Sequence, residues 1–259
     1  MSNLLDLKSV YKNYGAVQAL SGVDLSVDDG DVLAICGDNG AGKSTLIKIV
    51  SGAQTATSGR IFLHSEEIHF KSPADALSRG VATIYQDLAL APRLKVYQNI
   101  FMGSELIHPT FIPFIRLLDK KRMRQTAAEY LARLKIDIRD MNTAVSSLSG
   151  GQRQAVAISR ALRWDARLVI MDEPTAALGV KETAQVLDLI RELHAQGVTI
   201  IIISHNMEDV LAVANRVVIL KNGCKIGECL TEDLTAKDLS HMIATGDLGD
   251  RNLVRSGAN

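Results

Sequence analysis

The sequence is poor in cysteine and in aromatic residues, and it has no excess of either charge. Its three cysteines, Cys36, Cys224 and Cys229, are odd in number and lack C-x-x-C spacing, which argues against a disulfide framework and against a zinc site. Lysine and arginine total 29, as do aspartate and glutamate, so the formal net charge is zero. Proteins that grip nucleic acid by neutralising phosphates usually carry a basic excess. We therefore expect no nucleic-acid partner.

Long apolar runs are also missing. The longest, VTIIII at 198–203, falls far short of the ~20 residues that a membrane helix needs. The N-terminus lacks the basic region and apolar core of a secretory signal, and the cysteine usage is typical of a reducing compartment. We expect a soluble, cytoplasmic protein whose 259 residues form one large domain or two small ones.

Short apolar runs alternate with helix-like stretches along the chain. Helical patterns occupy residues 43–52 and 181–197. Three of the apolar runs are almost continuous, as strands buried on both faces of a sheet are: residues 81–85, 167–171 and 198–204. The alternation predicts an α/β fold with a mainly parallel sheet. The strand-like runs within residues 1–35, which include DVLAIC, predict an antiparallel β region at the N-terminal edge.

Residues 92–165 carry few strand signals and several helical ones. We interpret this segment as a helical subdomain inserted into the sheet domain, and its basic run at 117–134 as a solvated helix face rather than a binding site. Residues 1–245 then form a single domain. The polar residues 246–259 are expected to form a flexible tail.

Residues 37–44 read GDNGAGKS and fit the phosphate-binding pattern G-x-x-x-x-G-K-[ST] between an apolar strand and a helix. The glycines let the loop curl so that its N–H groups point at an anion, and the helix start adds its positive dipole end. Lys43 can reach the β- and γ-phosphates, and Ser44 offers a hydroxyl to Mg²⁺. The predicted nucleotide-binding loop of this P-loop NTPase core consists of Gly37, Asp38, Asn39, Gly40, Ala41, Gly42, Lys43, Ser44 and Thr45.

Polar side chains follow other predicted strands directly. Asp172 and Glu173 end the run at 167–171, where Asp172 suits the outer shell of Mg²⁺ and Glu173 is a candidate base for the attacking water. Gln86 and His205 each follow another such run. Because ligands bind at the carboxyl ends of strands in open parallel sheets, we expect these side chains and the P-loop to meet at one rim.

Residues 149–152, Ser-Gly-Gly-Gln, precede a helical run. Ser149 and Gln152 fit a capping box, in which each side chain bonds the backbone N–H of the other residue. The box does not explain Gly150 and Gly151, since each glycine costs about 1 kcal/mol relative to alanine inside a helix. Glycine also marks places where another backbone or a ligand comes close.

Taken in order, these residues resemble the ATP-binding subunit of ABC transporters. The resemblance covers the chain to about residue 245 and rests on Tyr14, GDNGAGKST, Gln86, LSGGQ at 148–152, VIMDEP and His205. LSGGQ together with the P-loop is highly specific, because ordinary P-loop kinases and GTPases lack it.

The resemblance implies a role for each residue. Tyr14 would stack on the adenine of ATP, and Ser44 and Gln86 would hold Mg²⁺ with the support of Asp172. Glu173 would activate water, while His205 would contact the γ-phosphate. Ser149, Gly151 and Gln152, with Gly150 between them, would meet the γ-phosphate of a nucleotide bound to a second subunit. Gly150 and Gly151 would leave the N–H groups of a second helix N-terminus exposed. These groups and the positive dipole end could then hold the γ-phosphate of a nucleotide bound to another chain.

Three segments are similar to the sugar-importer branch of the family, namely residues 48–61, 72–103 and 172–183. They imply an ATP hydrolase for pentose or hexose uptake, with a fructose-type importer as the best single choice. The implied assembly is a homodimer beneath two membrane-spanning permease subunits, peripheral on the cytoplasmic face of the membrane and indirectly linked to a sugar-binding protein. The helical subdomain and the segment around Gln86 would form the groove that docks the permease.

One departure from the family concerns residues 176–179, which read Ala-Ala-Leu-Gly where many members have Ser-Ala-Leu-Asp. In the family this segment crosses to the active site of the partner subunit, so the resemblance implies that residues 176–179 do so as well. Hydrolysis is still expected, because Glu173 and His205 remain. Three alternatives stay open: an ABC-type ATPase acting on DNA or ribosomes, an exporter, and a nucleotide-binding regulator without activity. The first usually carries a long coiled-coil insertion, extra domains or tandem cassettes, and this chain shows none.

Overall fold

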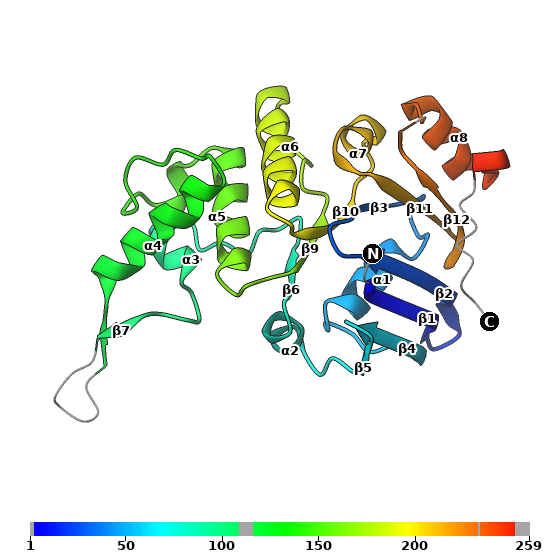
Figure 1. Cartoon of the computed structure of the whole chain (residues 1–259), viewed down its shortest axis with the longest axis horizontal. Coiled ribbons are helices and arrows are strands. Elements are labelled where there is room, and N and C mark those ends of the chain that lie inside the picture. The colour runs from blue at the N-terminus through cyan, green and yellow to red at the C-terminus, as the bar shows by residue number, and fades with distance from the viewer. Residues whose placement is uncertain (1–2, 109–115, 233, 252–259) are drawn as a thin grey trace.

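The computed structural model describes residues 3–108, 116–232 and 234–251, and two large β-sheets dominate it (Figure 1). The central sheet has the strand order β12-β11-β3-β10-β9-β6. Neighbouring strands are parallel except β11 and β12. The mainly parallel α/β fold is thus confirmed. In chain order the strands are β3 (Val32–Cys36), β6 (Val81–Ile84), β9 (Leu168–Asp172), β10 (Thr199–Ile203), β11 (Arg216–Lys221) and β12 (Cys224–Leu230).

The second sheet is antiparallel and confirms the expected N-terminal β region. Its order is β2-β1-β4-β5, formed by β1 (Asn3–Tyr14), β2 (Val17–Asp28), β4 (Ser58–Leu63) and β5 (Glu66–Ile68). One assignment was wrong: DVLAIC lies in the central sheet as β3, parallel to β10 and β11. All five residues of β3 are buried, so this strand needs neighbours on both edges and cover on both faces. A turn at residues 29–30 takes the chain from one sheet to the other.

Some of the helices contact strands directly, and others mainly contact further helices. The helices are α1 (Lys43–Val50), α2 (Pro73–Ser78), α3 (Val96–Ile100), α4 (Lys120–Arg133), α5 (Gly150–Leu162), α6 (Val180–Ala195), α7 (Met207–Val213) and α8 (Ala236–Thr245), with short 3₁₀ turns η1 (Val145–Ser147) and η2 (Gly249–Arg251). The helices expected at 43–52 and 181–197 are confirmed. None of the helices in the described ranges has the length and apolar character to cross a bilayer.

The helix expected over 117–134 begins later, at Lys120. Asp119 caps it by accepting the N–H of Arg122 at 2.9 Å. The two leucines before it form the short strand β8 (Leu117–Leu118), which pairs with β7 (Ile107–His108).

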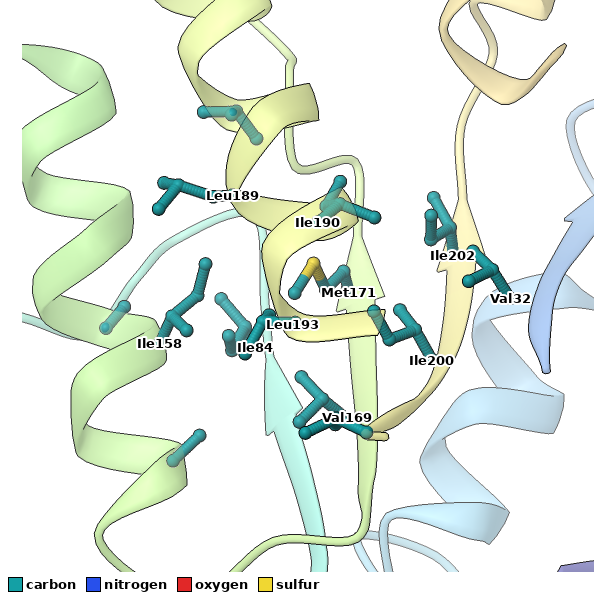
Figure 2. Close-up of a cluster of buried hydrophobic side chains, with 14 of the residues drawn as sticks. Val32, Ile84, Ile158, Val169, Met171, Leu189, Ile190, Leu193, Ile200 and Ile202 are labelled. Atoms are coloured by element: carbon teal, nitrogen blue, oxygen red, sulfur yellow. The ribbon is translucent and has the colours of Figure 1, made fainter. Parts of the chain in front are cut away.

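Alternate residues of the buried strands face two separate cores. On β10, Ile200 and Ile202 belong to the core under the helices, while Ile201 and Ile203 belong to the core shared with α1 and the antiparallel sheet. Figure 2 shows the first core, where side chains of α6 stand over β9 and β10. The sheet is therefore covered on both faces, and its strand ends are left as the place for polar side chains.

Helices α3, α4 and α5 contact one another at one end of the molecule (Figure 1). They fall within residues 92–165, whose status as a distinct subdomain stays a prediction. At the other end of the chain, Gly246 ends α8 in a left-handed conformation and Leu248 is buried. Arg251 pairs with Asp238 at 3.0 Å. The expected flexible tail starts at 246, and its residues 252–259 lie outside the described part of the chain.

Candidate functional site

The P-loop joins the end of β3 to the start of α1. Two of its positions lie so close to other backbone atoms that only glycine fits there. A Cβ on Gly37 would lie 2.2 Å from the carbonyl oxygen of Leu220. A Cβ on Gly42 would lie 2.8 Å from the carbonyl oxygen of Ala19, and its φ of +103° is one that other residues rarely adopt. Only glycine allows the loop to curl at these two positions.

Lys43 is 6% exposed and points back into the loop. Its Nζ donates to the carbonyl oxygens of Gly37 at 2.7 Å and Asp38 at 2.9 Å. Burial lowers the pKa of Lys43, and the negative charge of Glu173 partly opposes that shift. The ammonium is thus held inside the loop by two carbonyl oxygens, whose place the oxygens of a bound anion can take.

A cavity of about 630 Å³ lies over the P-loop and collects most of the predicted nucleotide site. Its walls include Asn39, Gly40, Ala41, Gly42, Lys43, Ser44, Thr45, Gln86, Asp172, Glu173 and His205. These residues come from the ends of β3, β6, β9 and β10. The four strands are adjacent in the central sheet, in the order β3-β10-β9-β6. Sequence reasoning placed them at one rim, and the structure brings them to one cavity; their individual roles stay predictions.

Glu173 follows β9 in a left-handed conformation, with a φ of +52°. Its N–H donates to the carbonyl oxygen of Ile203 at 2.9 Å, which ties this turn to β10. Its Oε1 lies 3.2 Å from Nε2 of His205, and its Oε2 accepts the backbone N–H of His205 at 3.4 Å. Strained backbone at a strand end is typical of a functional position, and both carboxylate oxygens are oriented by one residue.

Burial raises the pKa values of both adjacent carboxyl groups. For Glu173 the positive charge and backbone N–H of His205 partly oppose the shift, and for Asp172 the charge of Lys43 does so. A carboxylate with a raised pKa binds a proton more readily than an exposed one. Glu173 is therefore suited to accept a proton from a water molecule in this cavity.

Ser44, Gln86 and Asp172 offer a hydroxyl, an amide and a carboxylate oxygen to the same cavity. Oxygen ligands of this kind fit Mg²⁺, which keeps several waters and is held by one or two protein carboxylates together with substrate phosphates. Across the described residues, no cluster of three or more histidine, cysteine, aspartate or glutamate side chains could hold a metal ion. This sparse donor set fits an ion that arrives with a nucleotide.

Tyr14 is not among the residues that line this cavity. Its hydroxyl bonds to Oε1 of Gln54, and the Lys12 ammonium lies 5.2 Å from the centre of its ring. The wall beyond the P-loop is formed instead by Val17, Gln18 and Ala19, and Val17 is 66% exposed. Sequence reasoning missed these three residues, for which no motif gives a signal. Stacking of Tyr14 on adenine stays a prediction.

The capping box at Ser149 is confirmed. The Ser149 hydroxyl accepts the N–H of Gln152 at 3.3 Å, and Oε1 of Gln152 accepts the N–H of Ser149 at 3.1 Å. Helix α5 starts at Gly150. Gly150 lines a second cavity of about 450 Å³, which shares Gln86 and Glu173 with the first. Ser149, Gly151 and Gln152 are not among the residues that line either cavity.

The two glycines of this stretch have a reason within the chain that the sequence did not reveal. A Cβ on Gly150 would lie 2.4 Å from Cδ2 of Leu178, and a Cβ on Gly151 would lie 2.8 Å from Oε1 of Gln185. The N–H of Gly150 is donated to Oε1 of Glu182 at 2.7 Å. The first turn of α5 therefore packs directly on the start of α6. The sequence suggested that the N–H of Gly150 was exposed, but in the structure it is hydrogen-bonded to Glu182 of the same chain.

Comparisons with known proteins agree with this geometry. The family described as ABC transporter matches residues 20–176. The chain is 44% identical over 253 residues to the xylose/arabinose import ATP-binding protein XylG of Sulfolobus acidocaldarius and covers 98% of each protein. It is 44% identical over 237 residues to the fructose import ATP-binding protein FrcA of Rhizobium meliloti and covers 91% of each. It is 40% identical to the ribose import ATP-binding protein RbsA 2 of Escherichia coli O157:H7, of which it spans 47%.

Solved structures with the same fold are ATP-binding cassettes. The ADP conformation of MJ1267, a cassette of an ABC transporter, superposes with a TM-score of 0.80 at 28% identity, covering 95% of this chain and 96% of that one. A dimeric post-hydrolysis state of the cassette MJ0796, bound to ADP and Pi, gives a TM-score of 0.72 at 25% identity, covering 89% and 100%.

Proposed function

Because the chain belongs to the ABC transporter family, we propose that it binds and hydrolyses ATP to energise the import of a monosaccharide. The observation that carries the proposal is the cavity of about 630 Å³, in which the P-loop meets Asp172, Glu173 and His205. Such a rim can hold a triphosphate and present a carboxylate to an attacking water. The similar import proteins for xylose/arabinose, fructose and ribose supply the class of cargo.

The triphosphate binds at the N-terminus of α1. The N–H groups of the loop and the positive end of the helix dipole attract its oxygens. The ammonium of Lys43 exchanges the carbonyl oxygens of Gly37 and Asp38 for phosphate oxygens, which adds negative charge beside a buried cation.

Ser44, Gln86 and Asp172 would hold Mg²⁺ in this site. The ion, when bound, neutralises charge on the phosphate oxygens. The carboxylate of Asp172 is buried enough to have a raised pKa, so a cation beside it would favour its ionised form.

Glu173 takes the proton of the attacking water. His205 holds the carboxylate through its ring nitrogen and its backbone N–H, and the exposed part of its ring is available to the γ-phosphate. The water is thereby oriented by a fixed base on the far side from the leaving group.

The test is ATP binding and turnover by three variants of the full chain. Lys43→Ala should abolish nucleotide binding or turnover. Glu173→Gln should keep ATP binding but lower kcat by about 10²- to 10⁴-fold, the usual contribution of a general base. Glu129→Gln, an exposed glutamate on α4, is the control and should behave as wild type. An unchanged rate in Glu173→Gln would contradict the assignment of the base. Unchanged binding together with unchanged turnover in Lys43→Ala would remove the P-loop from the mechanism.

The working assembly is a homodimer bound to membrane-spanning permease subunits on the cytoplasmic face of the membrane, served by a sugar-binding protein. A cassette of similar fold is dimeric in its post-hydrolysis state, which supports the dimer. Residues 1–245 act as the nucleotide-binding domain, with the helices of 92–165 and the segment around Gln86 facing the permease.

The cargo can be identified by uptake of labelled sugars. Cells that lack this chain should lose uptake of one among xylose, arabinose, ribose and fructose, and the wild-type chain should restore it while Lys43→Ala does not. Restoration by both chains would mean that the nucleotide site does not drive transport. Loss of efflux rather than uptake would identify an exporter.

A further inference from the structure

The N-termini of α5 and α6 lie close together, and the carboxylate of Glu182 lies between them. Helix α5 starts at Gly150, and α6 starts just after Gly179, which is its N-cap. Oε1 of Glu182 accepts the N–H of Gly150 at 2.7 Å, and Oε2 accepts the N–H of Gly179 at 3.4 Å. Helix N-termini leave N–H groups without intrahelical partners and carry partial positive charge. A single carboxylate therefore accepts one N–H at each helix start and places its negative charge beside both.

The packing around Glu182 leaves little freedom. The position of a Cβ on Gly150 lies only 3.1 Å from Oε1 of Glu182 and 2.4 Å from Cδ2 of Leu178. A side chain at 150 would displace the carboxylate, the leucine or both. Glycine at this position lets the backbone of α5 come within hydrogen-bond distance of a side chain from α6.

Glu182 also supplies what residue 179 lacks. Gly179 has no side chain that could cap α6, although its extended backbone and the absence of atoms within 4 Å of a Cβ would allow one. Aspartate is among the preferred N-cap residues because its carboxylate accepts an N–H of the first turn. Here the carboxylate comes from Glu182, three residues later, and it reaches α5 as well as its own helix.

We propose that Glu182 is a positioning residue, which fixes the first turn of α5 to the loop 176–179 so that Ser149–Gln152 and that loop meet the partner's nucleotide as one unit. The inference rests on the proposed function, because only a nucleotide-driven dimer uses both segments at once. The loop itself links the two regions, since Ala176 lines both the P-loop cavity and the second cavity that reaches Gly150.

The alternative is that Glu182 only caps α6. A cap contributes to stability and has no separate effect on turnover. A positioning residue changes turnover while ATP binding at the P-loop stays normal, since Glu182 does not line the P-loop cavity. The two roles therefore separate in kcat measured against the dissociation constant for ATP. The exchange of the two amides with solvent tests whether Glu182 protects them at all.

The experiment compares the full chain with Glu182→Ala, Glu182→Gln and a control, Asp188→Ala. Asp188 is a carboxylate on the same helix whose side chain is 74% exposed and pairs with Arg191. Hydrogen exchange at Gly150 and Gly179 is followed by NMR without nucleotide, and ATP binding and kcat are measured on the same samples.

In Glu182→Ala we expect exchange at both glycines to accelerate and kcat to fall by roughly tenfold or more, the size of one charge-assisted hydrogen bond. ATP affinity should stay within about twofold of wild type. Glu182→Gln keeps one oxygen acceptor and should lose less activity than Glu182→Ala, while Asp188→Ala should match wild type.

Faster exchange with unchanged kcat would reduce Glu182 to a cap and overturn the proposal. Unchanged exchange in Glu182→Ala would show that the contact does not protect these amides, which also overturns it. A wild-type chain that binds ATP but never hydrolyses it, alone or with its permease, would refute the proposed function itself, and the positioning role with it.

Discussion

At the scale of single residues, the relation between Glu173 and His205 decides how the site responds to pH. Glu173 is partly buried in a strained turn, and His205 contacts both of its carboxylate oxygens. Burial raises the pKa of Glu173, and the charge of His205 is the first of the effects that lower it again. Because His205 lowers the pKa of Glu173, the carboxylate can act as a base at lower pH than it could without the histidine.

Replacing His205 should therefore shift the pH dependence of turnover. Glu173 accepts a proton only when ionised, so kcat falls as the pH drops through its raised pKa. His205→Ala removes an effect that lowers this pKa, and the acid limb of the profile should move to higher pH. The measurement is kcat at saturating ATP from about pH 5 to pH 9.

The control for this profile is His69→Ala, which changes an exposed histidine outside the cavity and should leave the limb in place. His205→Ala should also lower kcat if the proposed contact of His205 with the γ-phosphate is lost, but a lower kcat does not by itself move the acid limb. A limb that stays put, or moves to lower pH, would contradict the coupling between these two residues.

At the scale of elements, apolar patterning was sufficient to predict the buried strands. Runs such as 198–204 become β10, whose residues are all buried, because only strands covered on both faces are continuously apolar. The strand β12 escaped prediction because Lys225 and Glu228 interrupt its apolar pattern, although Glu228 is only 1% exposed. A charged residue in a sequence gives no sign that an ion pair will allow its burial.

Contacts between elements were the part that sequence could not supply. Ser149 and Gln152 are three residues apart, so their capping box follows from local spacing. Gly150 and Glu182 are brought together only by the packing of α5 on α6, and glycine at the N-cap of α6 hides the usual capping pattern. Tyr14 shows the same limit, since its partner Gln54 comes from a distant part of the chain.

The buried ion cluster around Arg216 joins the antiparallel sheet to the central one. Arg216 on β11 pairs with Asp31 at 2.9 Å and Glu228 at 3.4 Å, and it lies 3.7 Å from Asp28 at the end of β2. Its side chain is 4% exposed and that of Glu228 is 1% exposed. Lys225 pairs with the other oxygen of Glu228 at 2.7 Å. Three strands and the turn before β3 thus depend on one guanidinium.

Removal of that guanidinium should weaken the junction strongly. Arg216→Met removes the guanidinium that lies among the carboxylates of Asp28, Asp31 and Glu228. Breaking a buried ion pair in this way costs about 3–5 kcal/mol. The free energy of unfolding, measured in urea, should fall by that amount. Arg251→Met removes a solvent-exposed pair with Asp238 and should lower the free energy of unfolding much less than Arg216→Met does. Equal losses in the two variants would contradict the importance of the buried cluster.

At the scale of the whole molecule, one chain provides one P-loop and one Ser-Gly-Gly-Gln helix start, and the two do not line the same cavity. The P-loop cavity is walled by the ends of central strands, whereas α5 begins at the second cavity, beside α6. A nucleotide held by both needs a second copy of the chain in a head-to-tail arrangement, with the two sites related by two-fold symmetry.

Each motif needs its own inactivating variant before this arrangement can be tested. Lys43→Ala removes the ammonium that we propose binds phosphate, and Gly151→Asp places a negative charge where the γ-phosphate is expected. A Cβ at 151 would also approach Oε1 of Gln185 at 2.8 Å, so Gly151→Ala is needed to measure the steric part of the effect. Gly151→Asp should bind ATP nearly as well as wild type while failing to turn it over, and Gly151→Ala should lose less activity.

Mixing the two inactive chains then distinguishes sites built in trans from sites built in cis. If each ATP is held by the P-loop of one chain and the glycine turn of the other, a mixed dimer has one site with both defects and one site with neither. Random pairing makes half of the dimers mixed, so an equimolar mixture of Lys43→Ala and Gly151→Asp should regain up to roughly a quarter of wild-type ATPase activity. If both motifs of one chain served the same nucleotide, every site would carry one defect and mixing would restore nothing. If the mixture is no more active than the separate variants, the site shared between two chains is refuted.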